Sequence, residues 1–149
     1  YGFLLNNELT DFDFAAPHPN VPEAGKRPRS SMAPTIALRD GKPAFSIGSP
    51  GGSTIITTVL QVIMNMVDHG MNVAEASTAP RIHHQWLPDE LRVEEGISLD
   101  TIRILQAKGH DVAVKEAMGS TQSIMRDPQT GTLYGASDPR RPDAATLGY

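Results

Sequence analysis

The sequence contains no cysteine among its 149 residues. This absence excludes disulfide bonds, thiolate metal sites and a cysteine nucleophile, although it does not select a cellular compartment. Aromatic residues make up only 5% of the chain, so the core must be built mainly from aliphatic side chains and methionine. No apolar run approaches the roughly 18 residues of a membrane-spanning helix. The sequence therefore predicts no membrane span.

Positive charge is not in excess either. Thirteen Lys and Arg against 17 Asp and Glu give a net charge of −4, so nucleic acid is not an expected partner. The hydrophobic content of 39% and the charged content of 20% are typical of a globular chain, and the length suits one domain. The start, Tyr1-Gly2-Phe3, carries neither an initiator methionine nor a charged leader, which predicts a processed chain or an excerpt.

Hydrophobic spacing predicts an α+β domain. Residues 13–31 hold four prolines and no hydrophobic period, which indicates an extended surface loop. The dipeptide Asp40-Gly41 suits a tight turn between two apolar runs, so we expect a hairpin there. The apolar pattern around 54–69 predicts a long helix buried against a sheet. Further helices are expected at 72–79 and 98–108, and strands at 34–38, 43–47, 112–114, 120–126 and 132–136.

Two adjacent glycines, Gly51 and Gly52, precede the long predicted helix. Their N–H groups are not shielded by side chains, so they could converge on a negative oxygen near the positive end of the helix. On glycine spacing alone, a flexible strand-to-helix turn is the better explanation. The surrounding residues match neither a P-loop, nor a dinucleotide-binding glycine motif, nor the nucleophile elbow of serine hydrolases.

Polar groups earlier in the chain offer complementary chemistry. Glu8 and Asp11 lie three residues apart in a polar turn, where two carboxylates could hold one ammonium group. Ser30 and Ser31 could donate two hydroxyls to a carboxylate. Each pair taken alone is equally consistent with an ordinary solvated loop. Together with the diglycine, they form a recognition set for an amino acid acylated through its side chain.

The histidines give no comparable signal. His83 and His84 are neighbours, which on a strand would point to opposite faces, and the chain contains no H-E-x-x-H motif. Structural histidines are therefore favoured over a metal site.

Several runs of residues occur in one order along the chain. They are Leu4-Leu5-Asn6-Asn7-Glu8-Leu9-Thr10-Asp11-Phe12, Lys26-Arg27-Pro28-Arg29-Ser30-Ser31-Met32, Gly48-Ser49-Pro50-Gly51-Gly52-Ser53 and Pro80-Arg81-Ile82-His83-His84-Gln85-Trp86. Together they closely resemble the small subunit of γ-glutamyltranspeptidases. The similarity continues through 116–123 and 135–140 to Tyr149, so the whole chain resembles the C-terminal portion of that subunit.

This resemblance implies an N-terminal-nucleophile hydrolase and part of its four-layer αββα sandwich. It implies γ-glutamyl transfer from glutathione and related amides to water or to amino acid or peptide acceptors, through an acyl-enzyme on an N-terminal threonine. No cofactor and no metal are implied. The site residues carried over are Glu8 and Asp11 for the α-ammonium, Ser30 and Ser31 for the α-carboxylate, and Gly51 and Gly52 for the oxyanion.

The resemblance also implies partners and a location. The partners are the large subunit of the same precursor and the N-terminal part of the small subunit, and the family's bacterial members are periplasmic or secreted. Because the chain begins downstream of the expected threonine, we expect it to be inactive alone and to expose apolar surface that its partner covers. The loop at 13–29 is shorter than in family members with a lid, and Arg29 stands where an apolar residue is expected.

Two alternatives stay open. One is a cephalosporin or related acylase of the same superfamily, although the acidic turn and the paired serines favour a glutamyl group. The other is a non-catalytic module that only binds γ-glutamyl compounds. A binder and an enzyme would differ at the threonine, which lies outside this sequence.

Overall fold

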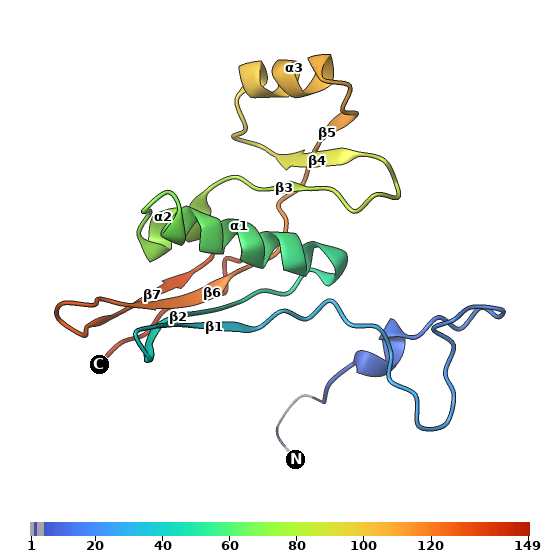
Figure 1. The fold of residues 1–149 in the computed structure, drawn as a ribbon, viewed down its shortest axis with the longest axis horizontal. Coiled ribbons are helices and arrows are strands. Elements are labelled where there is room, and N and C mark those ends of the chain that lie inside the picture. The colour runs from blue at the N-terminus through green and yellow to red at the C-terminus, as the bar shows by residue number, and fades with distance from the viewer. Residues whose placement is uncertain (1, 3–4) are drawn as a thin grey trace. The chain divides into compact units, whose positions relative to one another are not determined.

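The computed structural model describes residue 2 and residues 5–149, and the chain divides into two compact units (Figure 1). The first unit is Tyr1–Ser31 and the second is Met32–Tyr149. In its described part, the first unit contains one short 3₁₀ helix, η1, at Glu8–Asp11. Residues 13–31 form no helix or strand, as the proline-rich composition predicts.

The second unit combines helices with two sheets. A four-stranded antiparallel sheet has the order β1-β2-β6-β7, and a three-stranded sheet has the order β3-β4-β5. The strands are β1 Thr35–Arg39, β2 Lys42–Gly48, β3 Ile82–His83, β4 Leu91–Glu94, β5 Val112–Lys115, β6 Gln122–Arg126 and β7 Leu133–Ser137. The helices are η2 Gly52–Thr54, α1 Ile55–Val67, α2 Val73–Thr78 and α3 Leu99–Ala107.

The β1–β2 hairpin confirms the predicted turn. Asp40 and Gly41 have φ angles of 52° and 74°, the pair of positive values that a two-residue hairpin turn requires. Strand β2 then pairs with β6, which brings Ile47 opposite Ser123. The strand that leads into the diglycine therefore lies beside a strand from the far end of the chain.

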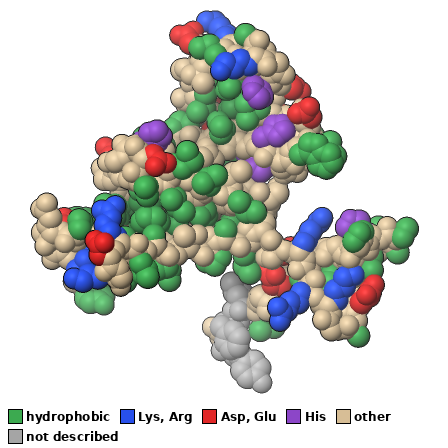
Figure 2. All heavy atoms as spheres, in the orientation of Figure 1, with side chains coloured by type: hydrophobic (Ala, Val, Ile, Leu, Met, Phe, Trp, Pro, Cys, Tyr) green, Lys and Arg blue, Asp and Glu red, His purple; other side chains and the backbone are tan. Residues whose placement is uncertain are grey.

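Helix α1 forms the predicted long helix, but only one of its faces is buried. Ile55, Val59 and Val62 join Ile47 of β2 and Ala76 of α2 in the core. The opposite face carries large apolar side chains that are 41–55% exposed, namely Ile56, Leu60, Met64 and Val67. Their spacing of four, four and three residues makes one stripe along the helix. Hydrophobic side chains gather over this region in Figure 2.

The two shorter helices confirm their predicted caps. Asn72 and Glu75 form a capping box at the start of α2, and the Ser98 hydroxyl accepts a hydrogen bond from the Thr101 amide at the start of α3. Strands β3 and β4 were not predicted. Strand β4 pairs in parallel with β5 through the connection that contains α3. No helix in residue 2 or 5–149 is long and apolar enough to cross a bilayer.

Candidate functional site

The acidic turn is a single turn of 3₁₀ helix. The Asn7 carbonyl accepts hydrogen bonds from the Thr10 amide at 3.0 Å and the Thr10 hydroxyl at 2.7 Å, and these bonds close the turn. In a 3₁₀ helix, side chains three residues apart lie one above the other. Glu8 and Asp11 therefore share one face of η1, and both are only partly buried. This arrangement suits two carboxylates that approach the same cation.

Ser30 and Ser31 follow a loop, residues 13–29, that is hydrogen-bonded to this turn through Asn20. The Asn20 side chain donates a hydrogen bond to the Asp11 carbonyl at 2.7 Å and accepts one from the Arg29 amide at 3.0 Å. Ser30 is exposed, and Ser31 is half-buried. The first unit thus connects the predicted ammonium-binding and carboxylate-binding residues. Sequence reasoning assigned no role to Asn20, because an asparagine in a proline-rich loop is an ordinary turn residue.

The diglycine adopts a backbone that only glycine tolerates well. Gly51 and Gly52 have φ angles of 140° and 56°, and a Cβ on Gly51 would lie 2.6 Å from Thr54 Oγ1. The Gly51 carbonyl accepts hydrogen bonds from the Thr54 amide at 3.1 Å and the Thr54 hydroxyl at 2.9 Å. Both glycines are exposed ahead of α1. The diglycine therefore forms a strand-to-helix turn, and this geometry is compatible with an oxyanion role for the same N–H groups.

A second loop packs against the diglycine. The ideal Cβ position of Gly51 lies 3.4 Å from the Cα of Gly119, and that of Gly119 lies 2.6 Å from the Ser49 hydroxyl. The same hydroxyl accepts a hydrogen bond from the Ser120 amide at 3.0 Å. The position of the 118–120 loop therefore restricts the conformation of the diglycine.

Four charged residues hold this second loop in place, three of them buried and the fourth, Arg140, partly buried. Arg81 donates to Asp138 at 2.6 Å, and Arg140 contacts both Asp138, at 2.9 Å, and Glu94. Asp138 is 0% exposed, Arg81 is 2% and Glu94 is 4%. Arg81 also donates to the Met118 carbonyl at 2.6 Å, and the Met118 amide donates to Glu94. We call these four side chains the ion network.

The ion network favours the charged forms of Asp138 and Arg140, whereas at Arg81 burial outweighs the bonds to Asp138 and lowers the pKa. Burial alone would raise the pKa of Asp138, but hydrogen bonds from the Thr121 amide and from Arg81 and Arg140 outweigh it and lower that pKa. Burial alone would lower the pKa of Arg140, but its bonds to Glu94 and Asp138 outweigh it and raise the pKa. Nothing in the spacing of these residues predicted the network, because they come from three separate parts of the chain: the segment before β3, strand β4 and the segment after β7.

His83 is buried and makes hydrogen-bond contacts within the second unit. It is 4% exposed, and its two ring nitrogens contact Thr57 Oγ1 at 2.8 Å and Gln85 Oε1 at 2.9 Å. Across residue 2 and 5–149, no group of three or more His, Cys, Asp or Glu side chains is placed to hold a metal ion.

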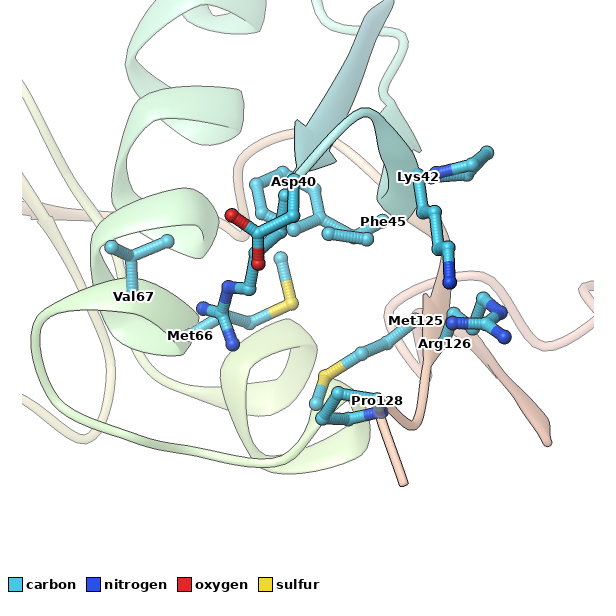
Figure 3. A pocket seen from close by; sticks show the side chains of 11 residues that line it. Asp40, Lys42, Phe45, Met66, Val67, Met125, Arg126 and Pro128 are labelled. Atoms are coloured by element: carbon cyan, nitrogen blue, oxygen red, sulfur yellow. The ribbon is translucent and has the colours of Figure 1, made fainter. Parts of the chain in front are cut away.

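Two cavities of the second unit differ in their relation to these groups. One cavity, of about 310 Å³, is lined by residues that include Phe45, Met66 and Met125 and by neither glycine of the diglycine. Figure 3 shows these side chains around it. Another, of about 560 Å³, includes Gly51 and the cationic side chains of Arg92 and Arg141. Both cavities have cationic side chains in their lining, namely Arg39, Lys42 and Arg126 in the first and Arg92, Arg140 and Arg141 in the second. The second cavity differs in that it brings positive charge near the predicted oxyanion position at Gly51.

Sequence comparison gives the chain clear relatives. Residues 1–148 match the model of the family described as gamma-glutamyltranspeptidase. The chain is 59% identical over 158 aligned residues to the glutathione hydrolase proenzyme of Escherichia coli, covering 99% of this chain and 27% of that protein. It is also 36% identical over 140 residues to the Acylase ACY 1 proenzyme of a Pseudomonas species, covering 91% of this chain and 24% of that protein. The chain thus spans about a quarter of the length of these relatives.

Structural comparison agrees. The gamma-glutamyltranspeptidase of Helicobacter pylori superposes with a TM-score of 0.85 at 48% identity, over 94% of this chain and 82% of that one. The chain accordingly has the α+β fold of the N-terminal-nucleophile hydrolases and forms part of their four-layer αββα sandwich. Taken with the matched family model, these likenesses show that the chain belongs to the gamma-glutamyltranspeptidase family.

Proposed function

We propose that this chain is the C-terminal portion of the small subunit of a γ-glutamyltransferase. The whole enzyme would transfer the γ-glutamyl group of glutathione and related amides to water or to amino acid or peptide acceptors. The observation that carries the proposal is the 59% identity to a glutathione hydrolase proenzyme over 99% of this chain. The shared face of Glu8 and Asp11 on η1 supports it, because a γ-glutamyl donor presents an α-ammonium group.

In the proposed mechanism, an N-terminal threonine supplied by the rest of the small subunit attacks the γ-carbonyl carbon. Its own amine accepts the hydroxyl proton, and the carbonyl oxygen becomes an oxyanion that the Gly51 and Gly52 amides stabilise. The leaving amine takes a proton as the carbon–nitrogen bond breaks. Water or an acceptor amine then attacks the resulting acyl-enzyme and releases the threonine. Glu8, Asp11, Ser30 and Ser31 hold the glutamyl group throughout.

The proposed partner is the large subunit of the same precursor. The apolar stripe on α1, formed by Ile56, Leu60, Met64 and Val67, supports this part of the proposal because such a surface is typical of a covered interface. The E. coli relative is named a proenzyme, which fits a precursor that is later divided. We further propose a periplasmic or secreted location, which cell fractionation would test.

The decisive experiment changes the carboxylate that the ammonium group needs. In the complete enzyme, Asp11→Asn should raise the KM of a γ-glutamyl donor about tenfold or more, because a charged hydrogen bond contributes roughly 1.5–3 kcal/mol. The matched control is Asp40→Asn, which removes the same charge at an exposed turn where asparagine also tolerates positive φ. An unchanged KM in the Asp11 variant would reject the proposed ammonium site.

An acylase function is the second candidate, because the chain is also related to the Acylase ACY 1 proenzyme. An enzyme for acyl groups without an ammonium would not need the carboxylates of Glu8 and Asp11. A comparison of γ-glutamyl and glutaryl anilides separates the two functions, since only the first carries the α-ammonium. Faster turnover of the glutaryl compound would favour the acylase.

A further inference from the structure

The Asn20 side chain bonds to the Asp11 carbonyl, in the proposed ammonium-binding turn, and to the Arg29 amide, next to the proposed carboxylate-binding serines. We propose that Asn20 is a positioning residue, which sets the separation between the ammonium-binding turn and the carboxylate-binding serines and thereby determines donor affinity. This inference rests on the proposed function, because it concerns the same substrate site. Asn20 itself is not proposed to touch the substrate.

The contacts of the Asn20 amide are chemically unambiguous. The Asp11 carbonyl can only accept a hydrogen bond and the Arg29 amide can only donate one, so the side-chain nitrogen faces Asp11 and the oxygen faces Arg29. The backbone of Asn20 is also held. Its carbonyl accepts from the Asp13 amide at 3.0 Å, and its amide donates to His18 Nδ1 at 3.1 Å. The side chain is therefore anchored at its base and engaged at both ends.

The position of Asn20 in the sequence explains why these bonds matter. Asn20 lies nine residues after Asp11 and nine residues before Arg29. One side-chain amide in the middle of the loop is therefore bonded to the backbone at both of its ends. Residues 13–31 have no helix or strand that would fix their ends, and a single 3₁₀ turn has little stability of its own. Without Asn20, both hydrogen bonds that join this segment to the Asp11 and Arg29 backbones would be lost.

A γ-glutamyl donor requires a defined separation between the ammonium-binding and carboxylate-binding groups. Its ammonium and carboxylate groups are attached to the same carbon, so their separation is fixed in the ligand. A site whose two halves are held at the matching separation binds without first ordering its own loop. The diglycine belongs to the second unit, whereas the Asn20 side-chain bonds to Asp11 and Arg29 lie within the first. Loss of Asn20 should therefore weaken donor binding and leave the chemical step unchanged.

The test uses the complete enzyme with Asn20→Ala and Asn20→Asp. The first variant loses both side-chain bonds, and the second keeps an oxygen for Arg29 but replaces the donor to Asp11 with a repelling oxygen. We expect both to raise the KM for γ-L-glutamyl-4-nitroanilide about five- to tenfold, with kcat per titrated active site within twofold. The added charge in Asn20→Asp would by itself favour an ammonium, so a raised KM there is specific to positioning.

A second substrate separates positioning from general damage. Glutaryl-4-nitroanilide lacks the ammonium group, so it gains nothing from the separation that Asn20 sets. The wild-type preference for the glutamyl over the glutaryl compound, as a ratio of kcat/KM, should shrink about five- to tenfold in both variants. The matched control is Glu23→Gln, which breaks the exposed 3.6 Å pair with Lys26 in the same loop and should leave the ratio unchanged.

Every outcome decides the question. A reduced kcat for both substrates with an unchanged ratio would mean a structural role and would overturn the inference. An unchanged ratio in the Asn20 variants, alongside a raised KM in Asp11→Asn, would overturn the inference and leave the proposed function standing. No effect of Asp11→Asn would overturn the proposed glutamyl site itself. If Asn20→Ala does not yield folded enzyme, Asn20→Asp decides, because it keeps the bond from Arg29.

Discussion

The two units of the chain hold their predicted site residues in different ways. Among the described residues of Tyr1–Ser31 none is buried, and the proposed glutamyl-binding groups are kept in place by hydrogen bonds between side chains and backbone. In Met32–Tyr149 the diglycine begins a helix whose inner face enters the core, and the ion network holds its neighbouring loop. The proposed recognition groups therefore lie on a 3₁₀ turn and a loop, and the proposed oxyanion donors lie on a packed scaffold.

This difference matches the demands of the two tasks. Oxyanion stabilisation depends on donors that are already oriented when charge develops, so a rigid support is useful there. Substrate recognition tolerates a less rigid support and varies more readily, because surface loops accept changes that a core does not. We expect substitutions in the second unit to affect the stability of the enzyme, and those in the first unit to affect its specificity.

The largest expected effect comes from the ion network. Asp138→Asn removes one charge and leaves Arg81 buried against a weaker partner, so it should lower the free energy of unfolding by about 3–5 kcal/mol. Urea denaturation of the complete enzyme would measure it. The control is Asp100→Asn, which removes the same charge from an exposed pair with Arg103 and should cost less than about 1 kcal/mol. Equal losses in the two variants would contradict a supporting role for the network.

A smaller effect is expected at the glycine beside the diglycine. Gly119 has a φ of 69°, and a Cβ there would lie 2.6 Å from Ser49 Oγ, so Gly119→Ala should cost about 2–4 kcal/mol and lower kcat. Gly25 in the first unit has a similar φ of 75° with nothing within 4 Å. Gly25→Ala should therefore cost only about 1–2 kcal/mol. A larger loss of thermal stability in Gly25→Ala than in Gly119→Ala would contradict this prediction.

The smallest expected effect is a dependence on acidity. Folding lowers the pKa of Asp138 below its ordinary value of 3.8, so folding favours the ionised carboxylate. The stability contributed in this way is present above pH 3.8 and is lost as the pH falls through the lower pKa of the folded state. Unfolding measured from pH 6 downwards should show this loss in the wild type and a flatter profile in Asp138→Asn. Parallel profiles would show that another group is responsible.

Local patterns in the sequence predicted much of the second unit. The hairpin at Asp40-Gly41, the capping box of α2 and the start of α3 depend on short-range preferences, and the structure confirms all three. Strand β3 was missed because it is only two residues long, and β4 was missed although its four residues alternate between apolar and charged side chains. The exposed stripe on α1 was also missed, since an apolar sequence does not reveal which face a neighbour covers.

The site was predicted unevenly for a similar reason. Glu8, Asp11 and the diglycine stand out because their residue types and spacing suggest chemistry directly. In the structure, Glu8 and Asp11 share one face of a 3₁₀ helix, and the diglycine has a backbone conformation that depends on glycine. Their closure around one ligand, with Ser30 and Ser31, stays a prediction, since these groups belong to separate units. Asn20 and the ion network depend on contacts between distant positions, which no local pattern contains.

The two hydrogen bonds to the Met118 backbone restrict the motion of the loop at 118–120. Its amide is bound by Glu94 and its carbonyl by Arg81, so the peptide planes on both sides of this residue cannot rotate without breaking a buried charged hydrogen bond. The Ser120 amide, which donates to Ser49, should consequently exchange its hydrogen with solvent only when a large part of the second unit opens. The backbone beside the diglycine would then fluctuate together with the core of the domain, unlike the loop at Arg29.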